Sequence, residues 1–250
     1  MGLFDLFKSK SGKDGGGAEK KSNAAAKYAE AAGSKRAQAY DRQEAIAELC
    51  KLRSADAVEA LLKRFTFATD PSITDQEEKE AAFEGIVNAG REALEPVRAF
   101  AAKAESVAAP IRILKEVLPE EELIAELLVW LKRWDTEYAK FIDPKLQILG
   151  VLSEYRHEHI REAVEPFLQD VNEPARFHAV EATFAQKDPA AMKALVAVIC
   201  DEESVRVRSK IADGFVATAW EIPEDDRDAV RKALPPAYGI NGEGVVNKRG

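Results

Sequence analysis

The stretch IREAVEPFLQDVNEPARFHAVEATFA, residues 160–185, decides the fold that we expect for this chain. It contains two segments, 160–170 and 177–185, in which apolar residues recur every three or four positions, as on one face of an amphipathic helix. Glu173 and Pro174 lie between the segments. Both residue types favour a helix start, because the first amides of a helix lack partners and its dipole attracts acids. The stretch therefore predicts two helices joined by a short turn.

Similar helix pairs recur along the chain. The second helix of each pair has a central apolar residue, and these residues follow one another at intervals of 31 to 37 positions: Ile46, Phe83, Leu114, Leu149, Val180 and Ile211. A period of this length, made of two antiparallel helices, indicates an α-solenoid in which each pair buries its apolar face against the next. No run alternates apolar and polar residues as a strand does. We therefore predict an all-α solenoid of about six helix pairs over residues 24–234.

Two of the turns between helices carry a family resemblance. Their sequences are QDVNEPARFHAVEATF (169–184) and CDEESVRVRSKIADGF (200–215). They resemble HEAT repeats, in particular the short bacterial HEAT-like repeats of the phycobilisome-lyase type, in which an Asp ends the first helix and Val-Arg and Ala open the second. The resemblance covers residues 40–234 and weakens toward the N-terminus, where residues 68–78 form a longer turn and the third pair, 106–142, lacks the arginine. The repeat alone implies no lyase activity.

The resemblance implies a structural role for four residues. In the family, the Asp and the Arg form an internal ladder, and the Asp caps the second helix. This role is carried to Asp170 and Arg176 in the first of the two turns, and to Asp201 and Arg206 in the second.

The formal net charge of -8 conceals an uneven distribution. Residues 1–40 hold eight basic and four acidic side chains and residues 235–250 carry +1, so the body over residues 41–234 carries -13. A body this acidic repels a phosphate backbone, because nucleic-acid affinity comes from clustered Lys and Arg. We therefore expect no nucleic-acid binding and predict a basic or neutral protein partner.

Both ends of the chain differ from the helical body. Residues 1–23 are predicted to form a flexible basic head and linker with an apolar cluster at Leu3, Phe4, Leu6 and Phe7. The cluster is too short to span a bilayer, which takes about 20 apolar residues. We expect it to fold back on the first helices, to dock on a partner, or to make weak peripheral contact with an anionic membrane. Residues 235–250 begin with two helix-ending prolines and are predicted either to be disordered or to cover the end of the solenoid.

Signals of catalytic chemistry are weak. His157, His159 and His178 lie near carboxylates, and a metal site built from them is geometrically possible. One HEAT-like enzyme family, deoxyhypusine hydroxylase, holds a di-iron centre on several His-Glu pairs, whereas this chain has a single such dipeptide. Cys50 and Cys200 lie in apolar helical segments and are expected to be small buried hydrophobes. We therefore predict no enzymatic activity, no metal and no cofactor, with a metal-dependent HEAT-like enzyme as the alternative.

An aromatic series is the most distinctive patch. Trp130, Trp134, Tyr138 and Phe141 are spaced by 4, 4 and 3 positions, so they share one face if the helix that starts at Pro119 continues past Asp135. Such residues fill a core between repeats or anchor an interface. Together these features predict a cytoplasmic, non-catalytic scaffold or adaptor that binds another protein. The metal-dependent enzyme and a peripheral membrane adaptor that uses the N-terminal cluster are the alternatives.

Overall fold

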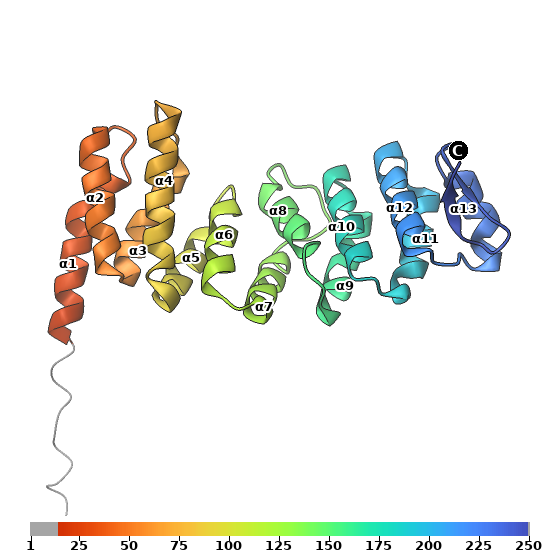
Figure 1. The fold of residues 1–250 in the computed structure, drawn as a ribbon, viewed down its shortest axis with the longest axis horizontal. Coiled ribbons are helices and arrows are strands. Elements are labelled where there is room, and N and C mark those ends of the chain that lie inside the picture. The colour runs from red at the N-terminus through yellow and green to blue at the C-terminus, as the bar shows by residue number, and fades with distance from the viewer. Residues whose placement is uncertain (1–14, 250) are drawn as a thin grey trace, which may run out of the picture. The chain divides into compact units, whose positions relative to one another are not determined.

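The computed structural model describes the backbone of residues 15–249 and the side chains of residues 22–249. The described part contains thirteen α-helices (Figure 1). Their bounds are α1 Gly15–Ala32, α2 Ala39–Leu52, α3 Ala55–Leu62, α4 Ser72–Val87, α5 Leu94–Ala101, α6 Ala108–Val117, α7 Glu120–Leu131, α8 Asp143–Leu152, α9 Glu158–Val164, α10 Glu173–Ala185, α11 Met192–Asp201, α12 Val205–Thr218 and α13 Arg227–Ala233. The predicted all-α class is confirmed.

Short 3-10 segments and one hairpin complete the described part. The 3-10 segments are η1 Lys63–Thr66, η2 Gly90–Ala93, η3 Glu165–Gln169, η4 Pro189–Ala191 and η5 Glu224–Asp226, and the strands are β1 Tyr238–Ile240 and β2 Val246–Lys248. The chain divides into two compact units. Unit 1 runs up to Ala104 and includes Ala109–Leu118, and unit 2 consists of Glu105–Ala108 and the chain from Pro119 onward.

In unit 1, helices pack on both their first and second neighbours along the chain. α1 contacts α2 and α3, α2 contacts α3 and α4, and α3 contacts α4 and α5. The core between them is aliphatic, with Ile46, Leu49, Leu61 and Ile86 fully buried.

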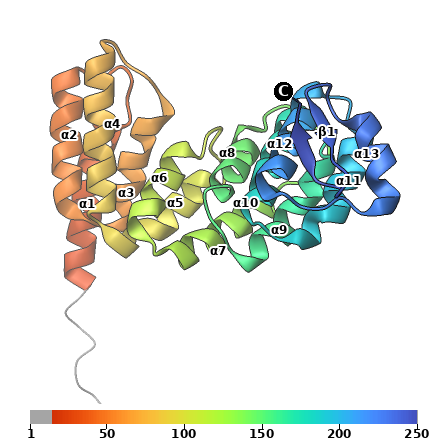
Figure 2. The same cartoon turned by 45° about the vertical axis from the view of Figure 1, so that its right-hand side comes forward.

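In unit 2, the helices form two rows. One row is α8, α10 and α12, and the other is α7, α9 with η3, α11 and α13, with consecutive members of each row in contact. Contacts of α7 with α8, of α9 and η3 with α10, and of α11 with α12 join the rows (Figure 1, Figure 2). All six residues that define the sequence period are buried, four of them with no exposed area: Leu114, Leu149, Val180 and Ile211.

Local sequence explains where the helices of unit 2 start. Pro174 lies in the first turn of α10, directly after the acidic Glu173. Ser204 caps α12, because its Oγ accepts a hydrogen bond from the Val207 amide at 3.3 Å. The helix start that the sequence marked at Glu173 and Pro174 is therefore built as expected.

The two chain ends differ from the expectations in different ways. The flexible head and linker predicted for residues 1–23 is wrong from Gly15 onward, where α1 begins, since the Ala, Lys and Glu that follow are good helix formers. The predicted cluster Leu3, Phe4, Leu6 and Phe7 lies outside the described residues. The C-terminal tail is folded: β1 and β2 pair antiparallel, and the tail contacts α12 and α13.

The tail is held to unit 2 by buried and polar contacts. Tyr238 and Val246 are buried. The Tyr238 hydroxyl donates to Asp213 Oδ1 of α12 at 2.8 Å, and the Lys248 ammonium lies 3.0 Å from the same oxygen. Of the two expectations for this segment, the structure shows the ordered one, in which the tail covers part of α12 and α13.

Candidate functional site: an acidic groove between α9–η3 and α11

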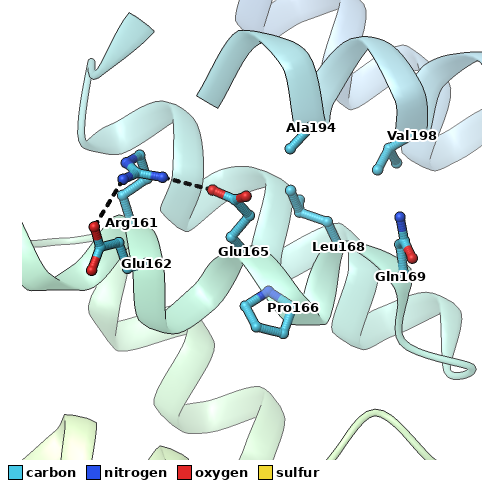
Figure 3. Close-up of a pocket in the computed structure, with 8 residues that line it drawn as sticks. All are labelled: Arg161, Glu162, Glu165, Pro166, Leu168, Gln169, Ala194 and Val198. Atoms are coloured by element: carbon cyan, nitrogen blue, oxygen red, sulfur yellow. Dashed lines mark hydrogen bonds and ion pairs between the residues drawn. The ribbon is translucent and has the colours of Figure 1, made fainter. Parts of the chain in front are cut away.

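A groove runs between the α9–η3 segment and α11 of unit 2 (Figure 3). It consists of two adjoining pockets of about 420 and 390 Å³ that share Leu168, Gln169 and Val198. We call it the α9–α11 groove. It is lined by Arg161, Glu162, Glu165, Pro166, Leu168, Gln169, Arg176, Ala194, Ala197, Val198, Asp201, Glu202 and Glu203.

The floor of the groove is apolar. Leu168 and Val198 are 1% and 6% exposed, and in Figure 3 they face each other from η3 and α11, beside Ala194. Alanines on α11 leave space because a methyl group is the smallest apolar side chain. Pro166, on the η3 side, is exposed. The groove thus offers an aliphatic base that a side chain from another molecule could cover.

One end of the groove is organised by Arg161 of α9. Its Nε donates to Asp188 Oδ2 at 2.7 Å, its Nη1 to Glu165 Oε2 at 2.7 Å, and its Nη2 to Glu162 Oε1 at 3.2 Å. Burial lowers the pKa of the Arg161 guanidinium, but its hydrogen bonds to the carboxylates of Asp188 and Glu165, and their negative charge, more than offset this and raise the pKa above its ordinary value. Arg161 is therefore charged and already neutralised by carboxylates of this chain.

The other end is organised by Arg176 of α10. Its Nε and Nη2 donate to the two carboxylate oxygens of Glu202 at 2.6 and 2.8 Å, and its Nη1 donates to the Asp170 carbonyl at 2.8 Å. Burial raises the pKa of Glu202, but Arg176 and the Ser204 amide outweigh this and leave the pKa below its ordinary value. Glu202 is therefore held as a carboxylate by its bidentate partner.

The predicted ladder is present in altered form. Asp170 meets Arg176 through its backbone carbonyl, while its carboxylate accepts from the Asn172 amide at 2.8 Å and from Lys145 Nζ at 2.6 Å. The predicted capping role of Asp170 is wrong, because no side chain caps α10; the Asp170 carboxylate instead binds the amide of Asn172, the residue before the helix. Lys145, which the sequence analysis missed, is the cation that pairs with the Asp170 carboxylate.

The expectation for Asp201 and Arg206 is wrong. Asp201 is the last residue of α11 and is exposed, whereas Glu202 turns inward in extended backbone and receives Arg176. Arg206 forms an exposed pair with Glu173 at 2.8 Å and stacks over the Phe177 ring. Glu202 therefore takes the ladder position here. Its carboxylate accepts a hydrogen bond from the Ser204 amide two residues later, just as the Asp170 carboxylate accepts one from the Asn172 amide.

A sequence position that three cations share could have indicated these ion pairs. Arg42, Lys145 and Arg176 each lie four residues before a central apolar residue of the period. Each donates to a backbone carbonyl upstream of its helix: that of Ala37, two residues before α2, of Asp135, eight residues before α8, and of Asp170, three residues before α10. Each also pairs with a carboxylate 25 to 36 residues later. A cation at this position therefore joins consecutive segments of the chain in three of the six helix pairs.

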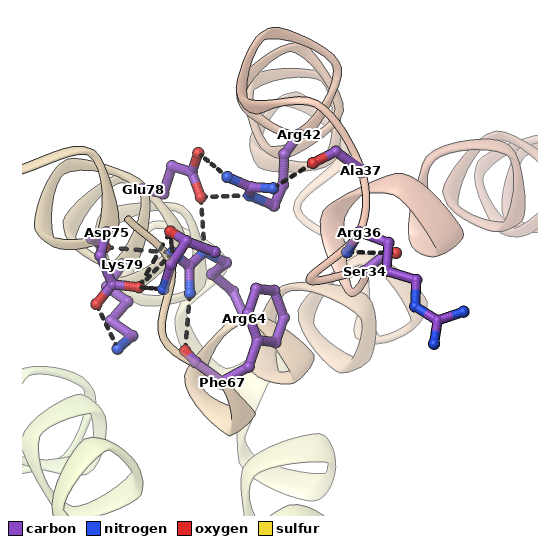
Figure 4. Close-up of polar contacts among 10 residues, drawn as sticks. Ser34, Arg36, Ala37, Arg42, Arg64, Phe67, Asp75, Glu78 and Lys79 are labelled. Atoms are coloured by element: carbon purple, nitrogen blue, oxygen red, sulfur yellow. Dashed lines mark hydrogen bonds and ion pairs between the residues drawn. The ribbon is translucent and has the colours of Figure 1, made fainter. Parts of the chain in front are cut away.

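In unit 1, Arg42 belongs to a larger buried cluster of charged side chains (Figure 4). Glu78 Oε2 accepts from Arg42 Nε at 2.6 Å and from Arg64 Nε at 2.8 Å, and Arg64 Nη2 donates to Asp75 Oδ1 at 2.7 Å. Arg64 and Glu78 are at most 1% exposed. Because each charge is paired and hydrogen-bonded, the cluster is a structural element rather than a candidate site.

The aromatic series does not form a shared face. Helix α7 ends at Leu131, so Trp134, Tyr138 and Phe141 lie in the segment that leads to α8. Trp130 is 2% exposed and its Nε1 donates to Glu126 at 2.7 Å, which removes it from the candidate interface. Trp134 is half-buried, with Lys145 Nζ 5.9 Å from its ring centroid. Tyr138 and Phe141 are strongly exposed, at 78% and 64%.

Exposed apolar side chains gather at one kind of position. Among the described residues, six of the seven large ones lie in the first two residues of a helix or within five residues before it, at α2, α4, α8, α10 and α12: Tyr40, Ile73, Tyr138, Phe141, Val171 and Val205. In unit 2, the Val171 amide donates to the Thr136 carbonyl at 3.1 Å, which ties the segment before α8 to the turn before α10. Val171 and Val205 each lie two residues beyond a groove residue, Gln169 and Glu203.

The histidines and cysteines lie apart from the groove lining. His157 Nε2 is 3.1 Å from Glu121, and His178 Nδ1 is 3.0 Å from Glu181. Within the described residues, no group of three His, Cys, Asp or Glu is arranged to hold a metal ion. Cys50 is half-buried and Cys200 is exposed, so the expectation that both are buried is wrong for Cys200.

Comparison with protein-family models, with curated proteins and with solved structures finds no match to this chain. In the part of the chain that the structure describes, no helix is both long enough and apolar enough to cross a bilayer.

Proposed function

We propose that this chain is a non-catalytic scaffold or adaptor, built as a HEAT-like α-solenoid, that binds a partner protein through the α9–α11 groove. The groove carries the proposal, because it combines a buried aliphatic floor with an exposed polar rim. This is the composition of a protein interface, in which an apolar centre is surrounded by polar groups.

The packing of the helices supports the solenoid part of the proposal. In unit 2, consecutive members of each row are in contact, as expected when repeated helix pairs stack on their neighbours. The recurring cation at Arg42, Lys145 and Arg176 makes the same two kinds of contact each time. A repeated sequence position with a repeated contact is what stacked HEAT-like repeats require.

The proposal places the protein in the cytoplasm, with no cofactor. The alternative of a peripheral membrane adaptor depends on Leu3, Phe4, Leu6 and Phe7, which lie outside the described residues, and it stays a prediction. Comparing the liposome co-sedimentation of the full chain with that of a variant that lacks residues 1–23 tests it.

Affinity purification with a blocked groove tests the main proposal. Ala197 is exposed on α11 and lines the groove, so Ala197→Trp fills the groove without altering the core. Ala217 is exposed on α12 and does not line the groove, which makes Ala217→Trp the matched control. Proteins that co-purify with the wild-type chain and with Ala217→Trp should be lost with Ala197→Trp, when both variants unfold at the wild-type denaturant concentration. An unchanged set of co-purifying proteins would contradict the proposal.

A further inference from the structure

We infer that the α9–α11 groove recognises a basic segment of its partner, in which Lys or Arg side chains flank a large apolar side chain. This inference rests on the proposed function, since it specifies the chemistry of the molecule that fills the groove.

The charges of the lining favour a cationic occupant. Five carboxylates line the groove against two arginines, and each arginine is already paired: Arg161 with Glu165 and Asp188, and Arg176 with Glu202. Neither arginine is therefore available to pair with an anionic ligand.

Three carboxylates of the rim remain open to a partner. The Glu162 side chain is 74% exposed and touches only the edge of Arg161, at 3.2 Å. Within residues 22–249, no ion pair reaches the exposed Asp201 or Glu203. Because exposed carboxylates lose little hydration when a cation approaches, they serve mainly to steer the encounter and to select the partner by charge.

The thiol of Cys200 lies beside the rim carboxylate of Asp201. Burial is the largest cause that raises its pKa, and the carboxylates of Asp201 and Asp226 raise it further. A negative potential that disfavours a thiolate beside Asp201 equally favours a lysine or arginine there. It also disfavours phosphate groups and acidic peptides as occupants.

The apolar requirement comes from the floor of the groove. Leu168 and Val198 form the floor, and the pockets beside them hold the volume of a large side chain. A segment with an apolar side chain over the floor would place neighbouring cations at the rim.

Selection of peptides on the full chain tests this inference without knowledge of the partner. A random peptide library displayed on phage is selected on the wild-type protein and depleted on Ala197→Trp, so that the retained peptides depend on the groove. These peptides are synthesised with a fluorescent label, and their affinities are measured by anisotropy at low and high salt.

A pair of charge-matched variants distinguishes attraction of a peptide to the groove rim from its attraction to the overall negative charge of the protein. Glu162→Lys with Glu203→Lys reverses two rim charges, and Glu59→Lys with Glu92→Lys reverses two exposed charges of unit 1. Groove-dependent peptides should be net positive and carry a large apolar residue. Their Kd should rise about tenfold, or about 1.4 kcal/mol, with the rim variant, and by less than about twofold with the control.

The possible failures are distinguishable. Groove-dependent peptides that are neutral or acidic would overturn the inference about charge and leave the groove as a binding site. Equal losses with the rim variant and the unit 1 control would overturn it too, because the attraction would then be non-specific. Failure to recover any groove-dependent peptide, with the affinity-purified set also unchanged by Ala197→Trp, would count against the groove itself.

Discussion

Arg176 and Glu202 form a bidentate pair across 26 residues of chain, with Nε and Nη2 of the arginine 2.6 and 2.8 Å from the two carboxylate oxygens. The same guanidinium donates to the Asp170 carbonyl at 2.8 Å. One side chain thus joins the turn before α10 to the turn before α12, and it does so at the rim of the α9–α11 groove. The groove and the stability of unit 2 therefore depend on a shared residue.

Arg176→Met should lower the free energy of unfolding of unit 2 by about 3 kcal/mol. The Glu202 side chain is only 2% exposed, so the variant leaves a buried carboxylate without its main partner. Urea unfolding and hydrogen exchange of α10 and α12 measure the effect. Arg206→Met is the control, because its pair with Glu173 is half exposed and should cost less than about 1 kcal/mol. Equal losses in the two variants would show that Arg176 and Glu202 contribute no more than a surface pair.

Unit 1 should lose stability in acid below the ordinary pKa of an aspartate. Burial raises the pKa of Asp75, but hydrogen bonds from Lys79, Arg64 and the Thr69 amide outweigh it and hold the pKa well below 3.8. A carboxyl whose pKa is lower in the folded state contributes its full stability above its unfolded pKa, and this contribution is lost as the pH falls through the folded value.

The free energy of unfolding of unit 1 should therefore be insensitive to Asp75 titration above about pH 5 and fall steeply below 3.8. Urea titrations across this range, monitored by hydrogen exchange in α4, measure it. Asp75→Asn should be less stable at neutral pH, and its free energy of unfolding should depend less steeply on pH below 3.8. An acid limb of unchanged slope in Asp75→Asn would assign the effect to other carboxyls.

Gly85→Ala should destabilise unit 1, although alanine ordinarily favours a helix over glycine by about 1 kcal/mol. A Cβ at position 85 of α4 would collide with Cys50 Sγ of α2, and overpacking of this kind costs about 1–3 kcal/mol. Adding Cys50→Ala removes the sulfur and should restore much of the loss. The four unfolding free energies of this cycle give the coupling, and purely additive losses would rule out the steric explanation. Gly242→Ala, which meets no atom, should be close to neutral.

Trp130 and Tyr138 should differ sharply when each is replaced by alanine. Trp130 is 2% exposed, so Trp130→Ala should cost about 3–5 kcal/mol. Tyr138 is 78% exposed, so Tyr138→Ala should change the free energy of unfolding by less than about 0.5 kcal/mol. Thermal unfolding followed by circular dichroism compares them. A large loss in Tyr138→Ala would mean that the segment before α8 packs more tightly than its exposure indicates.

Prediction from sequence succeeded where the signal is local. The three- and four-residue spacing of apolar side chains identified the helices, and the central residues, such as Leu149 and Val180, are buried. It failed at helix ends. The aromatic series would share a face only in an uninterrupted helix, and α7 stops at Leu131. The ladder residue expected at Asp201 is displaced by one position for the same kind of reason, because α11 ends there and the chain turns Glu202 inward.

The groove had no sequence signal of its own. Its walls come from η3 and α11, whose apolar residues Leu168 and Val198 are 30 positions apart and are individually ordinary core residues of amphipathic helices. The charge of -13 on the body predicts a basic or neutral partner, but it does not say where on the surface the acidic side chains gather.

By itself, the sequence determined that this chain is helical and which central apolar residues its helices bury, because both follow from hydrogen bonds and apolar spacing within a few turns of one helix. Only the tertiary structure decided that Lys145 meets Asp170, that Arg176 meets Glu202, and that the carboxylates left over surround a groove. The reason is physical. Ion pairs between distant segments require the helices to be packed first, and the charges that remain unpaired are known only when every pair has been made.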